Sequence, residues 1–317
     1  MPRTVLVTGA NGFVGRALCT RLQQQGHSVR AAVRTSAALP GAQHSVTIAS
    51  LDAHTDWCAA LQGVDIVVHL AARVHVMNDR ATDPLQAFRS TNVAATLQLA
   101  RQAAAAQVQR FVFMSSVKAS GESTLPGQPL RESDAPQPQD AYGRSKCEAE
   151  EGLRQIASST GLEVVIIRSP LVYGPGVKAN FAALMRLVAR AWPLPLGAIH
   201  NRRSLVGLGN LVDFISTCAR HPQAANQTFF VSDGQDLSTS ELLRAMAQAA
   251  NVPARLLPVP AGLLLALGGC LGQGAAMQRL CGNLQVDIAK AQTLLQWVPP
   301  FTVAEGLQHA YRKAPLP

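Results

Sequence analysis

The sequence predicts an α/β fold in which a doubly wound parallel sheet forms the main core and a smaller mixed α/β domain follows it. Two observations lead to this prediction. Short apolar runs rich in valine and isoleucine alternate with stretches of helical periodicity along the first half of the chain. These runs are continuously apolar, as expected for strands that helices cover on both faces. The predicted strands are residues 4–7, 28–34, 45–48, 64–70, 110–114 and 163–168.

A glycine-rich turn, TGANGFVG, follows the first predicted strand and leads into a predicted helix. Gly9 permits the tight turn, Gly12 lets the backbone approach a pyrophosphate, and Gly15 lets the helix pack closely on the strand. The free N–H groups at the start of that helix then face the phosphates. Because a strand precedes the turn and a helix and second strand follow it, the turn predicts a Rossmann-type dinucleotide site. The residues expected to contact the dinucleotide here are Gly9, Asn11, Gly12, Phe13, Val14 and Gly15.

The end of the second strand indicates which dinucleotide binds. An arginine there suits the 2′-phosphate of NADP, whereas an acidic residue suits the ribose of NAD. The chain has Arg34 at this point and no Asp or Glu between Arg21 and Leu51. NADP(H) is therefore favoured and NAD(H) stays possible, while an ordinary surface charge is the alternative for Arg34. Asp52, after the third strand, suits the adenine amino group or, equally, an Asx turn or helix cap.

Reactive side chains gather where the fourth and fifth predicted strands end. Ser116 follows the fifth strand, and Tyr142 and Lys146 share one helix face at i, i+4 spacing. A lysine ammonium close to a phenol lowers the phenol pKa from about 10 toward the range of a general acid or base. The three residues predict chemistry at a carbonyl or an alcohol; the alternatives are a plain helix surface and, for Ser116, an ST turn. Beyond the fourth strand, the small or apolar residues expected beside the dinucleotide are Leu70, Ala71 and Ala72.

Composition excludes several other classes of protein. The net charge is +9, but the basic residues are dispersed and not interleaved with aromatic ones, so we expect no nucleic-acid partner. Six cysteines without a CxxC pair indicate reduced thiols, no metal site and a cytoplasmic location. The dinucleotide motif begins at Thr8, which leaves no room for a cleaved targeting peptide. Residues 256–278 are uncharged, but prolines and glycines interrupt them, so a buried or amphipathic helix is expected rather than a membrane span.

Together these motifs resemble the extended short-chain dehydrogenase/reductases that act on nucleotide sugars, a group of UDP-sugar 4-epimerases, dehydratases and 4-keto reductases. The resemblance covers nearly the whole chain, through TGANGFVG, HLAA at 69–72, Asn92, SSVKASG at 115–121, YGRSK at 142–146 and RSPLVYGPG at 168–176. It implies an NAD(P)-binding Rossmann domain over 1–172, which regains a short segment near 205–220, and a nucleotide-sugar-binding domain over 173–317. By position, Ser116 matches the hydroxyl that holds the carbonyl and Tyr142 the acid/base. Lys146 matches the residue that binds the nicotinamide ribose and tunes the tyrosine.

The resemblance also implies how the substrate is held. Asn180 matches a ligand of the UDP diphosphate, and Leu196 belongs to a loop that resembles the one over the uracil. Arg203 and, more weakly, Arg279 match arginines that bind a diphosphate in bidentate fashion, with a surface role as the alternative for each. Lys118 and His75 are candidates for contact with the sugar, and a solvated loop charge is the alternative for both.

The catalytic residues leave the reaction open, because reduction and epimerisation both move a hydride between the nicotinamide and C4 of the sugar. Arg34 and the SSVKASG segment, which lacks the tyrosine that family epimerases carry there, favour a reductase. The expected reaction is hydride transfer from NADPH to C4 of a UDP-4-keto-6-deoxy-N-acetylhexosamine in bacterial polysaccharide precursor synthesis.

Two alternatives remain open. One is a UDP-sugar 4-epimerase with bound NAD, acting on UDP-Glc/Gal or UDP-GlcNAc/GalNAc. The other, from a different class, is a non-catalytic NAD(P)-binding sensor or assembly subunit. A homodimer is expected, with residues 81–107 and 140–158 as the face that would form it in this family.

Overall fold

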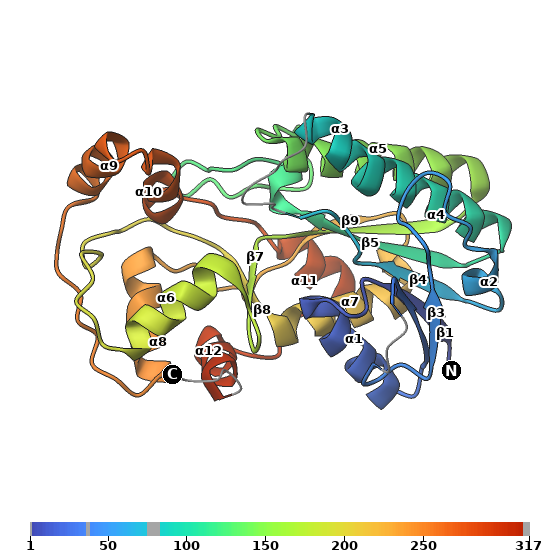
Figure 1. Cartoon of the computed structure of the whole chain (residues 1–317), viewed down its shortest axis with the longest axis horizontal. Helices are drawn as coiled ribbons and strands as arrows, with labels where there is room; N and C mark the ends of the chain where they lie inside the picture. The colour runs from blue at the N-terminus through green and yellow to red at the C-terminus, as the bar shows by residue number, and fades with distance from the viewer. Residues whose placement is uncertain (1, 36–38, 75–82, 313–317) are drawn as a thin grey trace.

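A computed structural model describes residues 2–35, 39–74 and 83–312 of the chain. Its main sheet has seven strands in the order β3-β2-β1-β4-β5-β6-β9, and every neighbouring pair is parallel (Figure 1). The strand order reverses beside β1, and this confirms the predicted doubly wound parallel sheet. The strands are β1 (Thr4–Thr8), β2 (Ser28–Val33), β3 (His44–Thr47), β4 (Ile66–His69), β5 (Arg110–Ser116), β6 (Glu163–Ser169) and β9 (Thr228–Phe230).

Two helical layers cover the sheet, and the side chains of each strand alternate between them. Val5 and Val7 belong to one core cluster and Leu6 to the other, because successive side chains of a strand point to opposite faces. α1 (Phe13–Gln24) packs beside α7 (Leu208–Arg220), and α4 (Ala95–Ala105) beside α5 (Ala141–Thr160). The other helices of this part are α2 (Cys58–Leu61), α3 (Pro84–Phe88), α11 (Ala289–Leu295), a π-helical turn at Arg89–Ala94 and single 3-10 turns at Val117–Ala119 and Pro222–Ala224.

The sheet draws on segments that are far apart in the chain. β9 pairs with β6, although its residues follow the whole of α6 and α7 in sequence. α11 contributes Ala291 and Leu295 to the same core cluster as α1 and α7. The division of the chain at residue 172 therefore stays a prediction, and the structure adds late segments to the layers around the sheet.

A second part of the molecule surrounds a two-stranded sheet of β7 (Leu171–Tyr173) and β8 (Leu205–Gly207). Tyr173 is fully buried there, and its hydroxyl donates to Oδ2 of Asp233 at 2.7 Å. The Asp233 carboxylate also accepts hydrogen bonds from the backbone N–H of Gly207 and the side chain of Asn210. These two bonds join β8 to α7. The helices of this part are α6 (Ala179–Ala189), α8 (Thr239–Ala249), α9 (Ala261–Cys270), α10 (Gly274–Cys281) and α12 (Val303–Arg312).

The uncharged segment 256–278 differs from the sequence expectation. Its helix α9 is neither buried nor amphipathic, because only Leu264 and Gly268 are buried while the leucines between and beyond them are exposed. Within the described ranges, no helix is long and apolar enough to cross a membrane.

Candidate active site

The turn after β1 is shaped for close approach of a ligand to the backbone. Gly9 has a φ of +66°, and a Cβ at this position would lie 2.9 Å from the backbone nitrogen of Ala71. A Cβ on Gly15 would overlap the carbonyl oxygen of Gly9, so helix α1 can pack against the turn only with glycine there. α1 begins after Gly12 with no side-chain cap and no acidic residue in its first turn. Its N–H groups are thus available to an anion, and the turn fits the pyrophosphate of a dinucleotide.

Buried hydrogen bonds hold this turn to the end of β4. The Thr8 hydroxyl lies 2.7 Å from Nδ1 of His69 and accepts from the backbone N–H of Ala71 at 3.2 Å. The other ring nitrogen of His69 lies 2.9 Å from the Thr96 hydroxyl. Burial, with a smaller contribution from the Lys146 charge, lowers the pKa of His69 to about 3, so the ring stays neutral. This network sets the spacing between the glycine turn and the segment that contains Leu70, Ala71 and Ala72.

The structure places two of the predicted catalytic side chains in contact. The Ser116 hydroxyl is hydrogen-bonded to the Tyr142 phenol, and it also accepts from the backbone N–H of Lys118 at 3.2 Å. The Tyr142 ring packs edge-on against Phe88 at 6.0 Å between centroids. A hydroxyl and a phenol in this arrangement can hold a carbonyl oxygen and exchange a proton with it.

Lys146, the third predicted catalytic residue, is hydrogen-bonded to the end of β5. Its Nζ donates to the carbonyl of Met114 at 2.8 Å and lies 4.5 Å from the centroid of the Phe113 ring. Burial raises the pKa of Tyr142 to about 12; the hydrogen bond from Ser116 opposes this shift, and the Asp140 charge adds to it. Burial also lowers the pKa of Lys146 to about 7, although the Glu150 charge partly offsets it. The tuning of the phenol by Lys146 stays a prediction.

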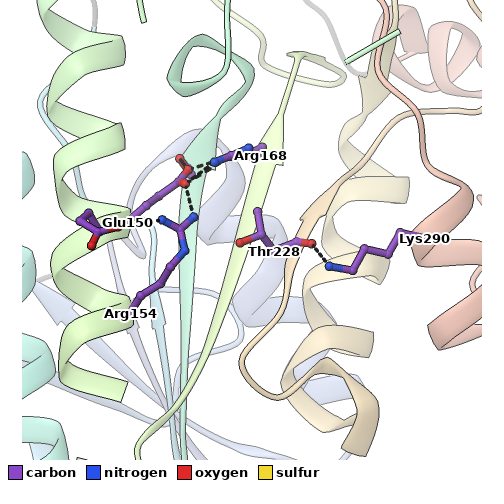
Figure 2. A network of polar contacts seen from close by, with 7 residues as sticks. Glu150, Arg154, Arg168, Thr228 and Lys290 are labelled. Atoms are coloured by element: carbon purple, nitrogen blue, oxygen red, sulfur yellow. Dashed lines mark hydrogen bonds and ion pairs between the residues drawn. The ribbon is translucent and has the colours of Figure 1, made fainter. Parts of the chain in front are cut away.

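A buried ion pair lies one helical turn beyond Lys146. Arg168 on β6 donates to both carboxylate oxygens of Glu150 on α5, at 2.6 to 3.2 Å, and both side chains are at most 2% exposed (Figure 2). Arg154 and the Ser115 hydroxyl also donate to this carboxylate, at 2.9 and 2.6 Å. Glu150 therefore fixes α5 against β5 and β6, and its charge favours the protonated form of Lys146. The sequence analysis missed this pair, because charged residues in a helix and a strand give no sign that they meet.

Lys118, expected as a sugar contact, has other partners. Its Nζ lies 2.6 Å from Asp140 and 3.1 Å from Glu122. Asp140 is the N-cap of α5 and accepts from the backbone of Gly143 at 2.6 Å. A Cβ on Gly143 would overlap the Lys118 carbonyl oxygen, so the turn after β5 packs directly on the first turn of α5. These contacts position Tyr142 relative to Ser116. His75, the other sugar candidate, lies outside the described residues.

Asn92 is a further residue to which the sequence analysis gave no role. It lies in the π-helical turn and is buried. Its amide exchanges two hydrogen bonds with the backbone of Arg73 and donates to the Ser145 hydroxyl at 3.0 Å. Asn92 thus ties the segment after β4 to the helix that carries Tyr142 and Lys146.

The residues proposed for the adenosine end are less enclosed. Arg34 is exposed directly after β2. Asp52 accepts from the backbone of His54 at 2.8 Å, and this bond and one from Ser50 lower its carboxyl pKa. The Asx turn that was the alternative for Asp52 is therefore present, and its contact with adenine stays a prediction.

In the second part of the molecule the two candidate arginines lie together. The Arg203 guanidinium donates to the carbonyl oxygens of Arg279 and Gly282 at 2.9 and 3.0 Å. Burial and the Arg279 charge both lower the pKa of Arg203, so an anion placed here would relieve a repulsion. Asn180 is exposed in the first turn of α6, whereas Leu196 is 8% exposed and packs in the core of this part.

Comparison with known proteins gives consistent matches over most of the chain. A model of the NAD dependent epimerase/dehydratase family matches residues 5–231. A UDP-glucose 4-epimerase of Vibrio cholerae is 46% identical, over 97% of this chain and 94% of its own length. A UDP-N-acetylglucosamine 4-epimerase structure from Bacillus cereus superposes with a TM-score of 0.80 at 18% identity, and a UDP-glucuronic acid 4-epimerase in complex with NAD, from the same species, with 0.77 at 20%. Each of these alignments covers 98% of both chains, and at such identities they support the fold alone.

These matches correct the expected reaction. The expectation of a UDP-4-keto-6-deoxy-N-acetylhexosamine 4-reductase is wrong, because the relative at 46% identity is a UDP-glucose 4-epimerase. The preference for NADP finds no support either, since the matching family is described as NAD dependent. The error has a physical origin. Both reactions need the same hydroxyl, phenol and ammonium. They differ in whether the 4-keto sugar rotates within the site to present its other face, and no short sequence motif encodes that rotation.

Proposed function

This chain belongs to the NAD dependent epimerase/dehydratase family, and from that premise we propose that it is a UDP-sugar 4-epimerase that works with bound NAD. The observation that carries the proposal is the Ser116–Tyr142 hydrogen bond at the end of β5, with Lys146 one turn further along α5. It lies in a chain that matches a 4-epimerase over 97% of its length. The retained Tyr142 and Lys146 speak against a non-catalytic sensor or assembly subunit.

The proposed mechanism assigns a task to each side chain. NAD held at the glycine turn would supply a reversible hydride acceptor for C4 of the sugar. Tyr142 takes the proton of the C4 hydroxyl as that hydride leaves, while Ser116 donates to the oxygen that becomes a carbonyl. After the 4-keto sugar has rotated within the site, Tyr142 would return the proton to the C4 oxygen while the hydride is returned to the opposite face of C4. Electrons and protons balance, so no reduced cofactor is consumed.

Lys146 and the arginines support these steps. A Lys146 side chain that leaves the Met114 carbonyl for the nicotinamide ribose would bring its ammonium toward the phenol, and this would lower the Tyr142 pKa from about 12. Arg203 and Arg279 would hold the UDP diphosphate. Asn180 and Leu196 stay proposals as substrate contacts, and Lys118 is proposed as a positioning residue instead.

NAD, rather than NADP, follows from the proposed reaction, because an epimerase recovers its hydride. Arg34, which is exposed directly after β2, then needs no 2′-phosphate partner. The homodimer, the cytoplasmic location and the place in polysaccharide synthesis stay predictions.

The decisive experiment is incubation of the purified protein with UDP-glucose, UDP-galactose, UDP-GlcNAc and UDP-GalNAc in separate reactions, with added NAD. We expect the C4 epimer of at least one substrate, no net change in NADH absorbance, and no deuterium at C4 when the reaction runs in D₂O, because the hydride returns within the site. Deuterium at C4, or no epimer from any of the four, would contradict the proposal.

A further inference from the structure

Helix α9 presents an apolar surface that no residue in the described ranges covers. Three leucines on it, Leu263, Leu265 and Leu267, are 52%, 39% and 51% exposed, and Leu271 directly after it is 75% exposed. Leu263, Leu267 and Leu271 follow one another at intervals of four residues, so they form one stripe along the helix. Only Leu264 and Gly268 face the protein. A helix that is apolar on all sides is normally buried, so this stripe indicates a binding surface for something outside the chain.

The surroundings of α9 add an aromatic residue. Trp192 is 57% exposed, whereas the other two tryptophans of the chain, Trp57 and Trp297, are at most 4% exposed. Trp192 begins the loop whose Leu194 exchanges backbone hydrogen bonds with Arg255 and Leu257, at 2.9 and 2.8 Å. An exposed indole therefore lies beside the segment that leads into α9, and Trp is typical of the boundary between water and lipid.

The charged residues that flank α9 in the sequence are of one sign. Between Glu241 and Asp287 the chain has no acidic residue, and its charged residues there are Arg244, Arg255 and Arg279. Arg255 and Arg279 are exposed on either side of the uncharged stretch. Figure 1 shows α9 and α10 together at the end of the molecule away from the N-terminus. A leucine stripe flanked by arginines is complementary to a surface that is apolar inside and anionic at its rim.

We propose that α9 docks the protein on an anionic membrane surface, with the leucine stripe in the interfacial layer and Arg255 among the lipid headgroups. A second copy of the chain fits less well, because in a two-fold contact the same arginines would face one another. α9 has ten residues, so it would lie in the interface rather than span the bilayer.

The test is sedimentation with large unilamellar vesicles of phosphatidylcholine, with and without phosphatidylglycerol. We expect the wild-type protein to bind the anionic vesicles, less so as salt is added, and its Trp192 emission to shift to the blue on binding. The double variant L263Q/L267Q should bind at least about tenfold less, because two half-exposed leucines no longer enter the lipid. R255Q should lower binding to anionic vesicles about fivefold and leave neutral vesicles unaffected.

The matched control is V298Q, which changes a residue that is 69% exposed and follows Trp297, whose indole donates to Asp213 of α7. It should bind like wild type, and both L263Q/L267Q and V298Q should keep wild-type thermal midpoints, since no core residue is altered. Failure of the wild type to bind anionic vesicles overturns the proposal, and so does equal binding by L263Q/L267Q. A concentration-dependent dimer that L263Q/L267Q abolishes, without vesicle binding, would show instead that a second copy covers α9.

Discussion

The part of the molecule around the seven-stranded sheet and helix α9 in the second part differ in which side chains they expose to water. Around the seven-stranded sheet, charged and polar groups are taken out of water, among them Glu150, Arg168, Lys146 and His69, and nearly all of their polar atoms have partners. In the second part, α9 leaves leucines in water. Buried charges hold catalytic atoms in place and shift their pKa values, whereas the exposed leucines of α9 add nothing to the core of their part. The sheet part is therefore organised around a reaction and the α9 end around a contact with something else.

The largest expected effect belongs to the sheet part. Tyr142→Phe removes the phenol hydroxyl and keeps the ring against Phe88, so kcat should fall by about a thousandfold or more. Binding of NAD and UDP should change little, as measured by calorimetry. Tyr311→Phe is the control, because Tyr311 also loses a buried hydroxyl contact, to Met185, but lies in α12. A Tyr142→Phe variant with more than a tenth of wild-type kcat would remove the acid/base assignment.

The buried ion pair should come next. Glu150→Gln leaves Arg168 buried without a charged partner and should lower the free energy of unfolding by about 3 kcal/mol or more. It also removes the charge that favours protonated Lys146, so the Lys146 pKa should fall below about 7. If the reaction needs the ammonium, activity is lost as pH rises through that pKa. The falling limb of the kcat–pH profile should then move to lower pH.

Glu151→Gln provides the matched control for this change. Glu151 is the next residue of α5, and its side chain is 63% exposed. It should change neither stability nor the pH profile. A Glu150→Gln profile that coincides with that of wild type would show that Glu150 is purely structural.

Two glycine substitutions compare how tightly the sheet part and helix α9 are packed. Gly15→Ala places a Cβ against the Gly9 carbonyl and the Ala10 backbone, and it should cost about 2 to 3 kcal/mol of stability and weaken NAD binding. Gly269→Ala in α9 meets no atom within 4 Å and should stabilise by up to about 1 kcal/mol. Thermal and urea unfolding of both variants measures the difference. Similar losses from both would mean that α9 is packed against something in solution.

The smallest effect is expected at Arg203, the proposed ligand of the UDP diphosphate. Arg203→Gln should raise KM for the UDP-sugar about tenfold, with kcat changed less than threefold, because one charged hydrogen-bonding partner is lost. Arg202→Gln is the neighbouring control, since Arg202 is 53% exposed and pairs with Glu241. Steady-state kinetics separates the two constants. An unchanged KM would remove Arg203 from the substrate site.

Much of the sheet could be predicted from the sequence. The predicted strands 4–7 and 163–168 match β1 and β6 to within one residue. β9 was missed, because three residues are too short to show a period and their place beside β6 depends on a long-range contact. Asp83 caps α3, whose first residue is Pro84, and a π-helical turn follows α3 where Asn92 is buried.

In the candidate site, too, local spacing predicts some features and long-range contacts decide the others. Ser116, Tyr142 and Lys146 could be singled out from local spacing, and the structure brings the first two into contact. The partner of Lys146 could not be predicted, because the Met114 carbonyl lies on a neighbouring strand rather than on the helix. Arg203 and Arg279 are distant in sequence, and only folding brings their charges together.

By itself the sequence determined the glycine turn, the order of strands and helices, and the spacing of Tyr142 and Lys146, because each depends on residues close together in the chain. Tertiary structure alone decided which charges meet in the interior and which apolar surface is left outside. The Glu150–Arg168 pair joins a helix to a strand, and the exposure of α9 depends on what the remaining chain covers. Neither is a property of a local segment, since burial is defined by the whole packed molecule.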